Sequence, residues 1–313
     1  MVSLFFSGCK GPKTYKIGIL AGLNYFAAVT DGFKAKLTEL GYIEGNNISY
    51  NVKRSNFDTD EYRSAIQEFI AAKADLIFVF PTEASLEVKQ ATQETDIPVV
   101  FAVANIEDTG LVRNIREPGG NMTGVRYPGP DIAVKRFEVM RELAPKAKRY
   151  WIPYQKGYPI VNSQLKVLKP VAAAAGVTLI EAPVSNAAEL EVAIQAQLKA
   201  GGMDVILFLA EPLAVTPENF VVMGKFAYRH KIPWGGAFME VEGYKTIFGV
   251  NIDSFKTGEQ AAIIAGKILR GAKAGSIPVV SSEYYMTLDY QTAQKFGVNV
   301  SESLLSQANK VIQ

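Results

Sequence analysis

The sequence is poor in the residues that build disulfides and metal sites. Its 313 residues include one cysteine, Cys9, and one histidine, His230. A lone cysteine cannot form an internal disulfide, and a zinc site needs about four ligands, usually from these two residue types. Because the same two types supply many catalytic groups, their scarcity also disfavours an enzyme. We expect no metal, no cofactor and no catalytic residues.

The sequence also lacks an excess of one charge and a long apolar run. It holds 33 basic and 31 acidic residues, a net charge of +2, which is too balanced to indicate a nucleic-acid partner. No apolar run of about 18 residues follows the N-terminus, so no transmembrane helix is expected. The sequence also lacks the motifs GxGxxG, GxSxG, HExxH and the Walker loop. The 48% hydrophobic content is that of an ordinary globular protein.

Strand and helix patterns alternate in two successive runs. The first run predicts helices at 26–41, 58–73 and 83–95 between strands at 15–20, 48–54, 75–80 and 97–103. The second starts near residue 131 and predicts strands at 148–154, 177–184, 204–210 and 232–237, again with helices between them. Such alternation indicates two α/β domains with parallel sheets.

Two phrases occur at equivalent places in both runs, which indicates an internal repeat. ADLIFVFPTEAS (74–85) corresponds to MDVILFLAEPLA (203–214), and DIPVVFA (96–102) to KIPWGGA (231–237). The Gly- and Pro-rich segment 118–130 separates the runs. The tail predicts a strand at 247–252, a helix at 254–270, a strand at 283–288 and helices at 290–296 and 302–312. We predict a tether at 1–13, lobe 1 at 14–126 completed by 250–280, and lobe 2 at 127–249 completed by 281–313.

Aromatic and polar side chains follow the predicted strands. Ligands of parallel α/β sheets bind beyond the carboxyl ends of strands, and rings with a few hydrogen-bonding groups are typical of small-molecule sites. A single tyrosine at a strand end is more often structural, so the prediction depends on the whole set. The candidate ligand-binding residues are Asn24, Tyr25, Phe26, Thr82, Ser85, Asn105 and Tyr127, followed by Tyr154, Tyr158, Glu211 and Phe238.

The single cysteine follows a short apolar stretch in LFFSGC (4–9) and precedes a polar segment, KGPKT (10–14). An apolar run, small residues and then a cysteine form the signal by which bacterial lipoproteins are cleaved and lipidated. The run is shorter than the usual signal core, and no basic residue precedes it. Lipidation of Cys9 is therefore one interpretation, and an exposed thiol in a disordered N-terminus is the other.

Several longer phrases resemble a known family. They are IGIL (17–20), DGFKAKLTELGYIEGNNISY (31–50), GLVRNIREPGGNMTGV (110–125), KRFEVMRELAPKAKR (135–149) and GVNIDSFKTGEQAA (249–262), besides the repeated phrases above. With these, the chain from about residue 15 resembles the bacterial ABC-transporter substrate-binding proteins of the type I periplasmic-binding fold. More narrowly, it resembles the subfamily that includes tryptophan/phenylalanine-binding lipoproteins.

The resemblance implies a fold, a location and partners. The fold would be two Rossmann-like, doubly wound parallel-sheet lobes joined by three crossovers, which close on a small solute. The protein would be a monomer that delivers this solute to an ABC importer permease. It would be extracytoplasmic, in the periplasm or on the outer face of the cell membrane, and held to the membrane by a lipid on Cys9.

The resemblance favours an aromatic amino acid as the solute. Thr82 and Ser85 suit its polar groups, and Glu211 is the candidate for its ammonium. Two positions depart from the family: Pro212 follows Glu211, and Ala237 stands where relatives tend to carry an acidic residue. A nucleobase, a nucleoside or another neutral aromatic solute is therefore the alternative. A ligand-binding sensor and an enzyme on the same scaffold are the rival classes.

Overall fold

The computed structural model describes residues 13–313, which fold into two units. Unit 1 contains the described residues up to Ala104, with Leu111–Arg126 and Ser254–Ser282. Unit 2 contains Asn105–Gly110, Tyr127–Asp253 and Glu283–Gln313. Apart from the excursion at 105–110, the chain thus passes between the units three times, after Arg126, Asp253 and Ser282.

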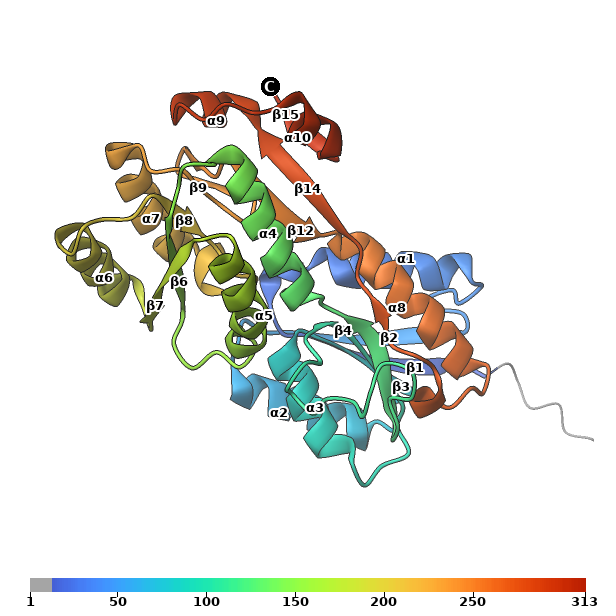
Figure 1. The fold of residues 1–313 in the computed structure, drawn as a ribbon. Coiled ribbons are helices and arrows are strands. Elements are labelled where there is room, and N and C mark those ends of the chain that lie inside the picture. The colour runs from blue at the N-terminus through green and yellow to red at the C-terminus, as the bar shows by residue number, and fades with distance from the viewer. Residues whose placement is uncertain (1–12) are drawn as a thin grey trace, which may run out of the picture. The chain divides into compact units, whose positions relative to one another are not determined.

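Unit 1 is built on a six-stranded sheet in which every pairing is parallel (Figure 1). The central strands β3 and β4 consist of fully buried apolar residues, as expected for strands covered on both faces. In spatial order the strands are β13 (Val280–Ser281), β5 (Met122–Arg126), β4 (Val99–Ala104), β3 (Leu76–Phe80), β1 (Tyr15–Ala21) and β2 (Ile48–Arg54).

Helices cover both faces of this sheet (Figure 1). α2 (Thr59–Ala71) and α3 (Thr82–Thr92) contact each other on one face, and α1 (Ala28–Glu39) and α8 (Ser254–Leu269) contact each other on the other. Glycines allow α1 and α8 to approach closely. A Cβ at Gly258 would lie 2.7 Å from the Phe33 nitrogen, and one at Gly32 would lie 2.8 Å from the Phe255 carbonyl carbon.

Unit 2 has a parallel four-stranded sheet that continues into a smaller mixed one. Its strands are β7 (Thr178–Val184), β6 (Arg149–Gln155), β8 (Val205–Leu207) and β9 (Trp234–Gly235) in that order, and then β12 (Phe248–Ile252), β14 (Tyr284–Asp289) and β15 (Lys310–Ile312). Backbone bonds at Gly236 join the two: its N–H donates to the Phe248 carbonyl (3.1 Å), and its carbonyl accepts the Val250 N–H (2.8 Å). β14 runs antiparallel to β12.

The helices of unit 2 also form pairs. α4 (Gly129–Leu143) contacts α5 (Val161–Ala174), and α6 (Ala187–Lys199) contacts α7 (Pro217–His230). The remaining elements are η1 (Asn24–Phe26) and η3 (Ala274–Ser276) in unit 1, with η2 (Leu213–Val215), β10 (Glu240–Val241), β11 (Tyr244–Lys245), α9 (Tyr290–Lys295) and α10 (Glu302–Gln307) in unit 2. The predicted fold class, two α/β halves with parallel sheets, is confirmed.

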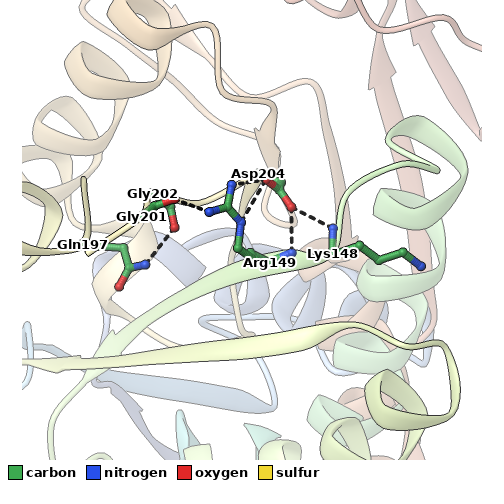
Figure 2. A network of polar contacts seen from close by, with 6 residues as sticks. All are labelled: Lys148, Arg149, Gln197, Gly201, Gly202 and Asp204. Carbon is green, nitrogen blue, oxygen red and sulfur yellow. Dashed lines mark hydrogen bonds and ion pairs between the residues drawn. The ribbon is translucent and has the colours of Figure 1, made fainter. Parts of the chain in front are cut away.

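The repeated phrases make the same contact in both units. In unit 1, Asp75 accepts the Lys16 N–H (2.8 Å) and its own N–H donates to the Lys16 carbonyl. In unit 2, Asp204 accepts the N–H of Lys148 (2.8 Å) and of Arg149 (2.9 Å). Figure 2 shows that the Arg149 guanidinium also binds the Asp204 carboxylate (2.6 Å) and the Gly201 carbonyl. Each aspartate therefore fixes the start of the neighbouring strand.

Several predicted elements end earlier than expected: the helix predicted at 83–95 ends at Thr92, and the strand predicted at 232–237 covers only Trp234–Gly235. The apolar run at 204–210 forms strand only over Val205–Leu207, because the next residues turn away after the Phe208 N–H donates to the Gly235 carbonyl (2.9 Å). The predicted helix at 302–312 is wrong beyond Gln307: residues Lys310–Ile312 form β15, which pairs with β14 in parallel.

The glycine contact between α1 and α8 predicts an unequal effect of two alanine substitutions in one helix. Gly258→Ala should lower the free energy of unfolding by about 1–3 kcal/mol, because the methyl group meets backbone atoms that cannot shift. Gly266→Ala is the matched control: its Cβ would meet only the ends of two side chains, Leu40 at 3.1 Å and Arg270 at 3.4 Å, and no backbone atom. It should be neutral or stabilising by up to about 1 kcal/mol through helix propensity. Denaturant unfolding followed by circular dichroism measures both; equal effects would contradict this account.

Candidate functional site

The strand ends of unit 1 bring two groups of predicted residues together. η1, with Asn24, Tyr25 and Phe26, follows β1, and Thr82 begins α3 directly after the adjacent strand β3. The Gly22 N–H donates to the Phe80 carbonyl (2.8 Å), which ties the two strand ends to each other. A Cβ at Gly22 would lie 2.9 Å from that of Ala84, so the close approach requires glycine.

The predicted residues of unit 1 differ in how they present their side chains. Tyr25 is 42% exposed and lies edge-on to Phe26, with ring centroids 5.0 Å apart. Thr82 and Ser85 are buried. The Ser85 hydroxyl donates to the Pro81 carbonyl (2.7 Å), one turn back in the chain. The Tyr25 ring is therefore exposed and the Phe26 ring half-buried, whereas the Ser85 hydroxyl is bonded to the backbone at the start of α3.

In unit 2, Glu211 connects the ends of two adjacent strands. It follows β8, and its Oε2 accepts the backbone N–H of Gln155, the last residue of β6 (3.1 Å). The same oxygen accepts the N–H of Leu213, the first residue of η2 (3.1 Å). Oε1 is buried and has no hydrogen-bond partner within residues 13–313. The carboxyl group is thus fixed through one oxygen, and the other is buried without a hydrogen bond among the described residues.

Burial sets the charge state of Glu211. The residue is 7% exposed, and desolvation raises the pKa of its carboxyl to about 7. The N–H groups of Leu213, Gln155 and Ala214 and the positive charge of Arg136 act in the opposite direction by stabilising the carboxylate. Glu211 therefore changes charge near neutral pH, which an ordinary glutamate does not.

Two buried polar residues that the sequence interpretation missed hold the segment before Glu211. The Gln164 amide on α5 donates to the Ala210 carbonyl (3.0 Å) and accepts the Ala210 N–H (2.8 Å). The Arg136 guanidinium on α4 donates to the Phe208 carbonyl (3.2 Å) and to the Val250 carbonyl (2.9 Å). Each lies on the apolar face of its helix, and a polar residue in an apolar stripe is the signal that could have revealed them.

The two predicted tyrosines near β6 have different surroundings. Tyr154 is in the strand itself, and its hydroxyl donates to Glu181 on β7 (3.0 Å), which also pairs with Lys169 (2.8 Å). Burial and this bond raise the pKa of Tyr154 to about 12. Tyr158 lies in the following turn, where its N–H donates to the Gln155 carbonyl (3.2 Å). Tyr158 is therefore close in sequence and structure to the Glu211 contact, whereas the Tyr154 hydroxyl is committed to Glu181.

The remaining predicted residues lie on other elements of unit 2. Asn105 follows β4 but clusters with unit 2, where Gly129 leaves room for its amide: a Cβ there would lie 2.9 Å from Nδ2. Tyr127 lies two residues before α4 and is 9% exposed. Phe238 is half-buried, and its N–H donates to Asn251 Oδ1 on β12 (3.1 Å). Asn251 was also missed, although it interrupts an apolar strand pattern.

Other kinds of site can be checked over the described part of the chain. No group of three or more His, Cys, Asp or Glu side chains within residues 13–313 is placed to hold a metal ion. None of the helices in the same range is both long and apolar enough to cross a membrane. Cys9, the predicted lipidation site, lies outside the described residues.

The sequence matches a family and one characterised relative. The family model for ABC transporter substrate binding proteins matches residues 19–312. A tyrosine-binding protein of Clostridioides difficile (strain R20291) is 29% identical over 254 residues, which cover 80% of this chain and 70% of that protein.

Solved structures of similar proteins share the fold. An ABC domain from Streptococcus pneumoniae in complex with L-Trp has a TM-score of 0.83 at 23% identity, covering 96% of this chain and all (100%) of that one. A conserved domain protein from Vibrio cholerae has a TM-score of 0.82 at 24% identity, with the same coverage of 96% and 100%. A ligand-free, open substrate binding protein with adhesive properties from Clostridium difficile has a TM-score of 0.74 at 23% identity, again covering 96% and 100%.

The raised pKa of Glu211 predicts how its amide variant changes stability with pH. Its folded-state pKa of about 7 exceeds that of an exposed glutamate. As the pH rises from the exposed-glutamate pKa to about 7, the carboxyl ionises more readily in the unfolded chain, so the folded protein loses stability. Glu211→Gln removes this loss. At pH 8 the variant should gain up to about 3 kcal/mol in free energy of unfolding over wild type, and at pH 4 the two should be equal.

Denaturant unfolding of the solute-free protein at both pH values measures this difference. Glu181→Gln is a control, because Glu181 is a partly exposed carboxylate with a cationic partner, Lys169. It should not be stabilising at pH 8. A Glu211→Gln variant less stable than wild type at pH 8 would show that the carboxylate is not the costly group described above.

Proposed function

This chain belongs to the family of ABC transporter substrate binding proteins, and from that premise we propose that the solute it binds is an aromatic amino acid. The tyrosine-binding relative from C. difficile is the observation that carries this proposal. The fold shared with an L-Trp complex supports it. The buried carboxylate of Glu211 suits an ammonium group, which a neutral solute such as a nucleobase or nucleoside lacks.

Different predicted ligand-binding residues suit different parts of the solute. Each unit offers candidate rings for the aromatic side chain of the solute, Tyr25 and Phe26 in unit 1 and Tyr158 in unit 2. Each ring contact would contribute about 0.5–1.5 kcal/mol beyond burial of area. Glu211 binds the ammonium. Thr82, Asn105 and the N–H groups at the start of α3 suit the carboxylate. The other predicted residues, Ser85, Tyr127, Tyr154 and Phe238, complete the set proposed to contact the solute.

The family role also defines the proposed location and partners. We propose an extracytoplasmic monomer that passes its solute to an ABC importer permease and catalyses no reaction. A sensor of the same solute would bind it equally well, but the match to transporter substrate binding proteins over residues 19–312 favours delivery.

Titration calorimetry tests the identity of the solute. L-Tyrosine, L-phenylalanine and L-tryptophan are titrated into wild-type protein beside adenosine and uridine. At least one amino acid should bind with micromolar or tighter affinity, and the nucleosides should not bind. Binding of a nucleoside alone would replace the amino-acid proposal with its alternative.

A substitution in η1 tests the ring contacts. Tyr25→Ala should weaken binding of the preferred amino acid about 2- to 10-fold, the loss of one ring contact. Tyr284→Ala on β14 is the matched control, since its side chain is equally exposed (43% against 42%) but is not among the predicted binding residues. Equal affinity of wild type and Tyr25→Ala would remove Tyr25 from the site.

We further propose that Cys9 carries the lipid that holds the protein to the membrane. The support is its place in the segment LFFSGC and its status as the only cysteine. Cys9→Ala should shift the protein from the membrane fraction to the soluble one on expression in the native host, and metabolic labelling with a palmitate analogue should be lost. Ser7→Ala is the control and should stay membrane-bound. Membrane association that persists in Cys9→Ala would contradict this anchor.

A further inference from the structure

The two oxygens of Glu211 have different surroundings, and this asymmetry has a consequence for solute binding. Oε2 accepts the N–H groups of Gln155 and Leu213, each at 3.1 Å. Oε1 is fully buried without a hydrogen-bond partner among the described residues. A buried carboxylate oxygen without a hydrogen bond destabilises the folded protein. Protonation of the carboxyl group removes this destabilisation when no solute is bound. A cationic donor removes it by pairing with the negative charge.

The groups around Glu211 supply one positive charge and otherwise neutral dipoles. Arg136 on α4 is the charged residue that acts on it, while β6 and η2 contribute backbone N–H groups. Gln164 on α5 contacts the preceding residue, Ala210, through a neutral amide. Arg136 already donates to the Phe208 and Val250 carbonyls, so its charge is shared among several acceptors. The site therefore stabilises the carboxylate only in part.

We propose that solute binding displaces a proton from Glu211: the carboxyl group carries the proton in the empty protein, its Oε1 accepts the solute's ammonium, and the proton leaves to water as the ion pair forms. This inference rests on the proposed function, because it needs a solute with an ammonium group. No bond other than O–H is broken, and the charge of the site stays balanced. Protons and solute consequently compete for Glu211.

The competition has a definite direction and size. Glu211 titrates at about 7 in the empty protein, so at low pH the solute must first remove the proton. Affinity for the preferred amino acid should fall about twentyfold between pH 7.5 and pH 5.5, the ratio of the ionised fractions of such a group. By the same relation, binding should release about 0.8 proton at pH 6.5 and about 0.1 at pH 8.

Calorimetry in two buffers measures the released protons directly. The preferred amino acid is titrated into the full chain at pH 6.5 in phosphate and in imidazole buffer, whose heats of ionisation differ. The apparent enthalpies should differ by about 0.8 times the difference in those heats, and the difference should nearly vanish at pH 8. Glu211→Gln should bind more weakly at pH 7.5 and release no proton at either pH.

Two controls separate this linkage from other titrations. His230→Gln removes the only histidine, the other side-chain type that changes charge near neutral pH, and should keep the full release. The deamino analogue of the solute, which lacks the ammonium, should release no proton and should not bind more weakly at pH 5.5. Circular dichroism and thermal unfolding confirm that the variants are folded.

The outcomes distinguish the inference from the function on which it rests. If no aromatic amino acid binds at any pH, the proposed function fails. If one binds with equal enthalpy in both buffers at pH 6.5, the function stands and the proton displacement is overturned. If Glu211→Gln releases as many protons as wild type, the titrating group is another residue, and the assignment to Glu211 is overturned.

Discussion

Parallel pairing of strands is the constraint on which the rest of the molecule depends. Because neighbouring strands run in one direction, their carboxyl ends meet at one edge of the sheet, and residues distant in sequence become neighbours there. In unit 1 this places η1 beside the start of α3, joined through the Gly22–Phe80 bond. In unit 2 it places Glu211 beside the end of β6. Binding residues can therefore change while the sheets that present them stay the same.

Two of the buried ionisable residues of unit 2, Arg136 and Glu211, act on each other. The Arg136 guanidinium bonds the Phe208 and Val250 carbonyls, on either side of the place where the parallel sheet gives way to the mixed one. Its charge also favours the carboxylate of Glu211. A buried charge pair offsets its desolvation only when every oxygen and N–H is satisfied, and Oε1 of Glu211 has no hydrogen-bond partner among the described residues. The same residue that stabilises the sheet thus influences the group proposed to bind solute.

The sequence predicted the architecture more fully than the site. Hydrophobic periodicity located nearly all helices and strands, because burial of one face or of both imposes a fixed spacing of apolar residues. Glu211 was selected as a candidate because it follows a buried strand, and its role in binding stays a prediction. Arg136, Gln164 and Asn251 were missed, because each occupies a position that periodicity assigns to an apolar residue, and only the structure shows which carbonyl or N–H it meets. The helix predicted at 302–312 is wrong beyond Gln307, because Lys310–Ile312 pair with β14 as a strand.

The glycine contact between α1 and α8 also determines when the protein can finish folding. α1 belongs to the first part of the chain and α8 to the last quarter, with nearly the whole of unit 2 between them. During synthesis, the face of α1 around Val29 and Phe33 stays uncovered until residues 254–269 have emerged. Unit 2 likewise waits for β14 and β15. Neither unit can therefore complete its fold before its own C-terminal segment has been synthesised, residues 254–282 for unit 1 and 283–312 for unit 2.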